Sequence, residues 1–219
     1  ALRSGSDCEV AAHAVNAVRH ILRGATDSEE AMWCLLAVLE HGGIDAGVIE
    51  QLDEVVPKLC RVASRDHKAR LPALACLAEL SAVYEHIDAY MLLLQNTTID
   101  VMREHTRPLL SDVTTLSIEM WSVLCESILS AAPETDSEDA RWSVRRAIPE
   151  LVPELLSCMS LQVEGARGPS ESAGACLQLL ADVSVETVLV VVAPYIKRNL
   201  LEDAPRGAAS WREREAAVT

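Results

Sequence analysis

The chain has 219 residues and a formal net charge of −14, and half of its residues are hydrophobic, yet aromatic residues make up only 3% and phenylalanine is absent. The acidic balance disfavours binding to the phosphate backbone of nucleic acids, which requires clustered lysine and arginine. Leucine, valine and alanine at this density suit many small contacts between helices. No stretch alternates convincingly with period two, so we predict an all-α protein.

The first half of the chain divides into pairs of predicted helices. Residues 7–23 carry apolar side chains at helical spacing, and a second helix follows from about residue 28 to residue 41. Glycine at positions 24 and 42 is a strong signal that each of these helices ends there. We predict the first pair at about residues 7–41 and the next two pairs at about 46–85 and 87–129.

An acidic link at residues 132–139 precedes two further predicted pairs, at about residues 140–184 and 187–219. The last pair is strongly apolar in its first helix, and a turn with Asp203, Pro205 and Gly207 separates that helix from the second. Neither helix has a full polar face, so each must be covered by its neighbours, as in a solenoid repeat. The chain ends inside a predicted helix, and we expect a fragment of a longer protein.

Three prolines recur in the same context, apolar-Pro-x-apolar, within the first helix of a pair. Pro57 and Pro153 are 96 residues apart, which is two repeats of 48, and Pro194 follows 41 residues later. These lengths bracket the HEAT-repeat period of roughly 40–47 residues. We therefore predict that residues 1–219 form one α-solenoid segment of about four and a half HEAT repeats.

Four segments resemble the HEAT repeats of the importin-β family of nuclear transport receptors. They are IEMWSVLC at 118–125, SAGACLQLLA at 172–181, APYIKRNL at 193–200 and SWREREAAV at 210–218. The resemblance covers almost the whole chain in order, and it points to the N-terminal half of that family's proteins. One departure is the loop at residues 163–170, which carries a single acid where the family has a long acidic loop. The alternative is a generic HEAT-repeat scaffold that assembles protein complexes.

The resemblance implies a nuclear import receptor that works in the cytoplasm, in the nucleus and at the nuclear pore. Its implied partners are phenylalanine–glycine (FG) nucleoporins, an importin-α-like adaptor or basic cargo, and Ran-GTP. The first helices of the pairs would hold nucleoporins in grooves, and the second helices would line a concave face for adaptors. The implied groove residues are Val15, Val18, Leu52, Val55 and Val56.

Glu119 and Glu126 are seven residues apart in one predicted second helix, so they share a face. By resemblance this face would bind the basic helix of the adaptor. For the two glutamates the alternative is a solvated helix face, and for the groove residues it is ordinary packing between repeats.

No pattern in the sequence points to catalysis, a cofactor or a metal. The six histidines are scattered without a metal-binding spacing, and none of the seven cysteines forms a CxxC pair. An odd, scattered set of cysteines favours reduced thiols in the cytosol or nucleus. The longest uncharged runs fall short of the roughly 20 residues that span a membrane. We predict a binding protein that is not an enzyme and does not insert into membranes.

Overall fold

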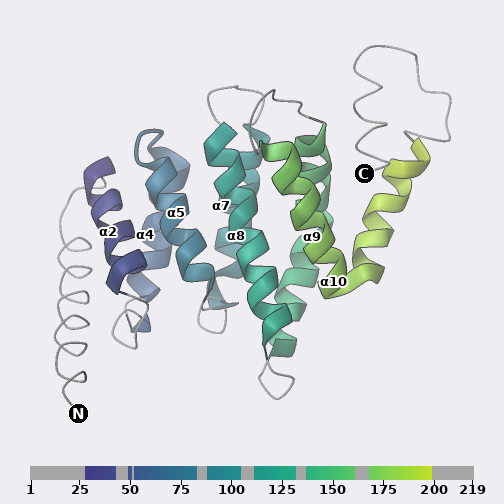
Figure 1. Ribbon diagram of the computed structural model, residues 1–219, viewed down its shortest axis with the longest axis horizontal. Coiled ribbons are helices and arrows are strands. Elements are labelled where there is room, and N and C mark those ends of the chain that lie inside the picture. Colours follow the sequence, from purple (N-terminus) through teal and green to yellow (C-terminus); the bar gives the residue numbers. More distant parts are fainter. Residues whose placement is uncertain are drawn as a thin grey trace.

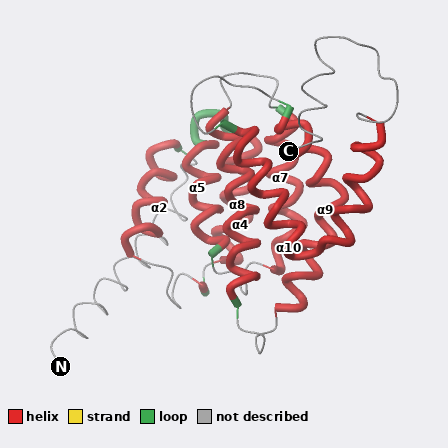
Figure 2. Tube along the Cα trace, turned by 45° about the vertical axis from the view of Figure 1, so that its right-hand side comes forward, coloured by secondary structure: helices red, strands yellow, loops and turns green. Residues whose placement is uncertain are grey.

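The computed structural model describes residues 28–42, 49–50, 52–82, 88–104, 111–131, 137–160 and 168–198. Within these ranges the chain forms helices and no strand (Figure 2), which confirms the all-α prediction. The helices are α2 (Glu29–Gly42), α4 (Leu52–Arg65), α5 (Arg70–Ser81), the 3-10 helix η1 (Asp88–Tyr90), α7 (Met91–Arg103), α8 (Ser111–Ser130), α9 (Ser137–Met159) and α10 (Pro169–Ile196).

The helices follow one another along the long axis of the molecule, from α2 at one end to α10 at the other (Figure 1). They form two layers. In the first, which we call the B layer, α2, α5, α8 and the part of α10 before Ser184 contact one another in sequence order. In the second, the A layer, α4 contacts α7 and α7 contacts α9. Each A helix also packs on the B helix that follows it, so the fold is the predicted α-solenoid.

Helix α4 shows how the sequence produces this packing. Leu52, Val55, Val56 and Leu59 recur at helical spacing and are all buried. Acidic residues lie in the first turn of α4 and Arg65 in its last turn, where each sign of charge complements the helix dipole. The helix ends at Arg65, inside the second predicted pair at about 46–85.

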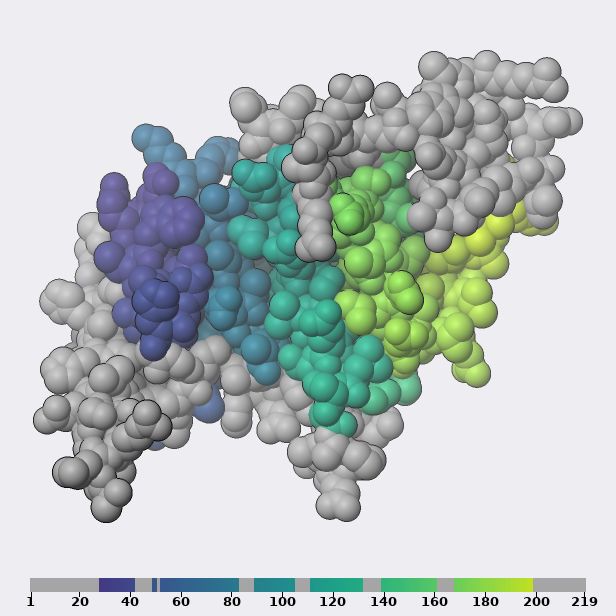
Figure 3. Space-filling view, viewed as in Figure 1, coloured from purple at the N-terminus to yellow at the C-terminus, as the bar shows by residue number. Residues whose placement is uncertain are grey.

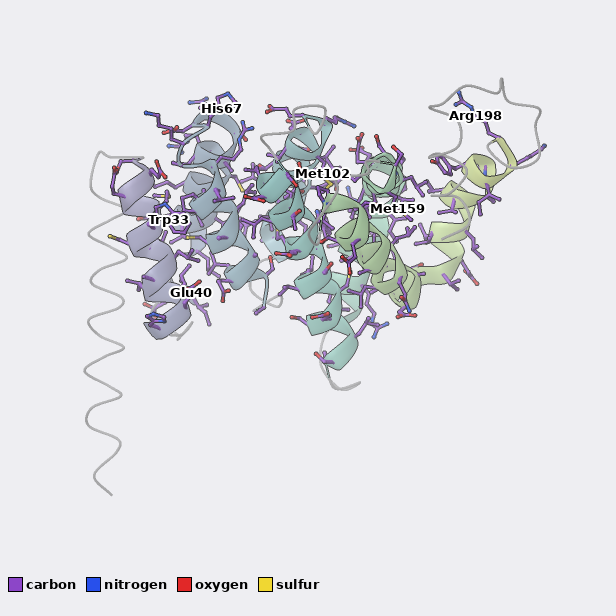
Figure 4. All side chains as sticks on the ribbon, turned by 45° about the horizontal axis from the view of Figure 1, so that its top comes forward. Trp33, Glu40, His67, Met102, Met159 and Arg198 are labelled. Atoms are coloured by element: carbon purple, nitrogen blue, oxygen red, sulfur yellow. The ribbon has the colours of Figure 1, made fainter. Side chains whose placement is uncertain are left out.

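Side chains from both layers fill the space between them. Trp121 on α8 is completely buried, so it belongs to the core. Met102 and Met159 are also buried, and Figure 4 shows them among the helices in the middle of the row. The core is therefore a continuous band that runs along the solenoid.

Helix α10 contains a sharp break at Ser184, whose φ of −159° and ψ of 83° are not helical. The Ser184 hydroxyl lies 2.8 Å from that of Thr187, in the first turn of the helical segment that follows. The break falls between the fourth and fifth predicted pairs. The predicted helices at 7–23 and 210–218 lie outside the described residues, so the complete division into pairs stays a prediction.

By length and composition α10 is also apolar enough to cross a membrane. Its acidic residues Asp182 and Glu186 flank the break at Ser184, in the middle of the helix. Carboxylates are costly near the centre of a bilayer. Since α10 packs on both α8 and α9, we assign it to the solenoid.

Candidate protein-interaction surfaces

The exposed charged side chains of the B layer are all acidic. Arg70 is the one lysine or arginine among its described residues, and that side chain is buried. The space-filling view shows how the successive helices form one extended surface (Figure 3). The exposed acids of the B layer are Glu30, Glu40, Glu79, Asp112, Glu119, Glu126, Glu171 and Asp182.

Three of these acids form a stripe along α8. Asp112, Glu119 and Glu126 are all exposed and are spaced by seven residues, so they lie on one face of the helix. Seven residues of helix correspond to about 10.5 Å along its axis. The structure thus places both predicted glutamates at the surface and adds Asp112, which the same spacing of seven in the sequence indicated and which our sequence reasoning missed.

One acid of the B layer, Glu30 at the start of α2, has a lowered pKa. The pKa of Glu30 is lowered by hydrogen bonds from its own backbone and from Ser28, and to a smaller extent by the charge of Lys68. Lys68 lies in the turn between α4 and α5, next to His67 at the edge of the solenoid (Figure 4). The positive charge of Lys68 therefore acts on the B layer from the turn between α4 and α5.

The predicted groove residues on α4 lie in the core and not at the surface. Val55 and Val56 are both 0% exposed, and Leu52 is also buried. Their side chains pack in the core, so a ligand cannot reach them in this structure. An apolar helical stripe looks the same in sequence whether it lines a core or a groove, which explains this error in placement. Val15 and Val18 lie outside the described residues and stay a prediction.

The A layer instead exposes apolar side chains on α7 and α9. Leu92, which is 64% exposed, and Leu93 lie in the first turn of α7, and Trp142, which is 55% exposed, lies near the start of α9. The guanidinium carbon of Arg146 lies 4.6 Å from the centre of the Trp142 ring. We call Leu92, Leu93 and Trp142 the A-layer apolar patch. A tryptophan flanked by arginines in an amphipathic helix was the signal in the sequence.

The described residues offer no group of three or more histidine, cysteine or acidic side chains that could hold a metal ion. Burial raises the pKa of Cys60 to about 11 and the pKa values of Cys158 and Cys176 to about 12. These thiols stay protonated at neutral pH and are poor nucleophiles.

The two-layered row of helices and the acidic B layer define an α-solenoid of the HEAT-repeat class, which binds partners through extended surfaces. No model of a known protein family matches the chain. Importin subunit beta-1 of Saccharomyces cerevisiae is 29% identical over 167 residues, which are 71% of this chain and 18% of that protein.

Solved structures agree with this likeness. A crystal structure of importin beta in a polyethylene glycol condition matches 98% of this chain and 26% of its own, with a TM-score of 0.72 and 25% identity. A structure of Kap95p with RanGDP matches 90% of this chain and 24% of its own, with a TM-score of 0.63 and 24% identity. The chain is thus similar to a HEAT-repeat segment of importin beta, and it spans about a fifth of the length of the curated relative it matches.

Proposed function

We propose that this chain is a segment of a nuclear transport receptor, and that its B layer binds a basic segment of a cargo adaptor or cargo. The observation that supports the proposal is the uniform sign of the B layer, whose exposed charges are acidic on all four helices. The receptor would act in the cytoplasm and nucleus and at the nuclear pore, as the likeness to importin beta suggests. Such a segment acts by binding alone, without catalysis.

Charge explains both the speed and the selectivity of this binding. Carboxylates of one sign attract a basic partner over a distance, and this attraction weakens as salt screens it. Each exposed ion pair contributes only about 0.2–1 kcal/mol, so useful affinity requires several pairs. The stripe Asp112, Glu119 and Glu126 provides three carboxylates on one helix, and α5 and α10 add more on either side.

The test uses a synthetic peptide that forms an amphipathic helix with lysine and arginine on one face. The double variant Glu119→Lys, Glu126→Lys should weaken peptide binding by about tenfold at low salt, and by less at high salt. A matched control changes Glu54 and Asp139, which are exposed acids of the A layer, to lysine, and it changes the net charge equally. Equal losses in the two variants would show that only net charge matters.

Nucleoporin binding is a second part of the proposal, and the A-layer apolar patch supports it. Phenylalanine side chains of FG repeats need apolar surfaces, and Leu92, Leu93 and Trp142 expose such surface on adjacent helices. We also include Ran among the partners of the whole receptor, because one structural relative is described as Kap95p with RanGDP. A generic HEAT-repeat scaffold would not bind FG repeats.

A further inference from the structure

Arg103, the last residue of α7, and Glu104, which follows it, carry opposite charges. They contact helices on opposite sides of α7, in the fourth and second pairs. Arg103 donates from Nε to Oε1 of Glu154 on α9, over 2.8 Å. Glu104 accepts a hydrogen bond from Nη1 of Arg70 at the start of α5, over 2.7 Å. Two consecutive residues thus connect the second, third and fourth pairs of helices at one edge of the solenoid.

The two contacts differ in their shielding from solvent. Arg70 is 2% exposed, and its Nε also donates to the carbonyl of Ala63 in the last turn of α4, over 2.6 Å. At the other end of α4, the hydroxyl of Tyr90 donates to the carboxylate of Asp53. The second and third pairs are therefore held together at both ends of their A helices.

The contact with the fourth pair is more accessible. Arg103 is 54% exposed and Glu154 is 17% exposed, whereas Arg70 is 2% exposed and its partner Glu104 is 39% exposed. Dissolved ions therefore reach the guanidinium of Arg103 far more readily than that of Arg70. Oδ1 of Asp100, one turn earlier on α7, lies 3.8 Å from Nη1 of Arg103. Asp100 can therefore serve as an alternative ion-pair partner of Arg103 when the pair with Glu154 opens. Salt should therefore weaken the ion pair between α7 and α9 more than the ion pair between Arg70 and Glu104.

We infer that the Arg103–Glu154 pair is an ionic joint that sets the angle between the third and fourth pairs of helices, and with it the shape of the acidic B layer. Helix α10 packs on both α9 and α8. A rotation of α9 relative to α7 must therefore move Glu171 and Asp182 on α10 relative to the stripe on α8. The consequence for binding rests on the proposed function, whereas the angle itself does not.

The joint and the net charge predict opposite effects of one substitution. Arg103→Gln makes the chain more acidic, so net charge alone would strengthen binding of the basic peptide described above. Loss of the joint would instead weaken peptide binding by up to about fivefold. This limit is the change in affinity that corresponds to the largest usual contribution of an exposed ion pair. Arg61→Gln is the matched control, because Arg61 is an exposed cation on α4 and belongs to neither contact.

The angle between α7–α8 and α9–α10 is measured on the whole chain from residual dipolar couplings of backbone N–H groups. We expect Arg103→Gln and high salt to change this angle in the same direction, and we expect no change in Arg61→Gln. The charge-swapped double variant Arg103→Glu, Glu154→Arg keeps the wild-type net charge and should restore both the angle and the peptide affinity.

Each outcome separates the joint from the proposed function. An angle that is the same in wild type, in Arg103→Gln and at high salt overturns the joint, whatever the peptide does. An angle that responds as expected in a chain that does not bind the peptide supports the joint and overturns the proposed basic partner. A response of Arg61→Gln equal to that of Arg103→Gln assigns the effect to net charge and also overturns the joint.

Discussion

The indole of Trp121 on α8 donates its Nε1–H to the hydroxyl oxygen of Thr98 on α7, over 3.0 Å, and both side chains are buried. The Thr98 hydroxyl in turn lies 2.8 Å from the carbonyl of Leu94, to which it donates. This chain of hydrogen bonds joins the A and B helices of the third pair. It satisfies the one polar atom of a large side chain that the core would otherwise isolate.

Thr98→Val should destabilise the chain, because it keeps the shape of the side chain and leaves the indole N–H of Trp121 without an acceptor. A buried donor without a partner costs about 1–3 kcal/mol. The free energy of unfolding, measured by urea denaturation, should fall by this amount.

The control is Thr114→Val on α8. The Thr114 hydroxyl is buried and has no hydrogen-bond partner among the described residues. Removing it should be neutral or slightly stabilising, since no partner is lost and a desolvated polar atom disappears. Similar losses of stability in the two variants would contradict the role of the Trp121–Thr98 bond.

Val55→Asp should unfold the chain or destabilise it severely, because Val55 is completely buried on α4. A buried carboxylate without a partner costs several kcal/mol or must take up a proton. The same substitution at the exposed Leu92 should change stability by less than about 1 kcal/mol, as surface changes usually do. The melting temperatures of both variants, measured by thermal denaturation, test this difference. A Val55→Asp variant as stable as the wild type would show that position 55 is not buried.

Trp142→Ser should weaken the binding of an FG-repeat peptide without changing the fold, since Trp142 is exposed and provides much of the A-layer apolar patch. Peptide titration by NMR should shift signals of α7 and α9. Trp33→Ser is the matched control, because Trp33 is an exposed tryptophan on α2 in the B layer, at the end of the row (Figure 4). Chemical-shift changes confined to B-layer helices would refute this site.

Stability should fall as the pH rises above the ordinary pKa of a thiol. Burial raises the pKa of Cys60 to about 11, whereas a thiol in the unfolded chain has a pKa of about 8.5. Between these values the unfolded chain loses protons that the folded chain keeps, so the stabilisation is complete at lower pH and is lost as the pH rises.

Urea denaturation at pH values of about 8 and about 10 measures this effect. The loss of stability between them should be about 1–2 kcal/mol smaller in Cys60→Ala than in wild type. Cys34→Ala is the control, because Cys34 is exposed on α2. An unchanged pH dependence in Cys60→Ala would show that the Cys60 thiol ionises equally well in the folded chain.

The sequence predicts the helices of this fold well, because helix signals are local. The stripe in α4 and the glycine before α10 mark elements that the structure contains. The exposure of Glu119 and Glu126 was also predictable, since charged side chains spaced by seven residues seldom face a core. No glycine or proline marks the break at Ser184 in the sequence. The local contact there is instead between two hydroxyl side chains, those of Ser184 and Thr187.

The surfaces were harder to predict than the helices. Val55 and Leu92 are both aliphatic residues in A helices, yet one is buried and the other is exposed. The difference depends on which neighbouring helix covers each position, and this is information from residues far away in sequence. The contact between Arg103 and Glu154 spans 51 residues and was invisible to sequence reasoning for the same reason.

The one-residue break at Ser184 also has a mechanical consequence. Because α10 runs from the B layer of the fourth pair directly into the next helical segment, no slack loop separates them. A force that pulls on the C-terminal part of α10 is transmitted to α8 and α9 without first being absorbed by a linker. In a single-molecule stretching experiment, the segment after Ser184 and the fourth pair should therefore yield in one step, as a single mechanical unit.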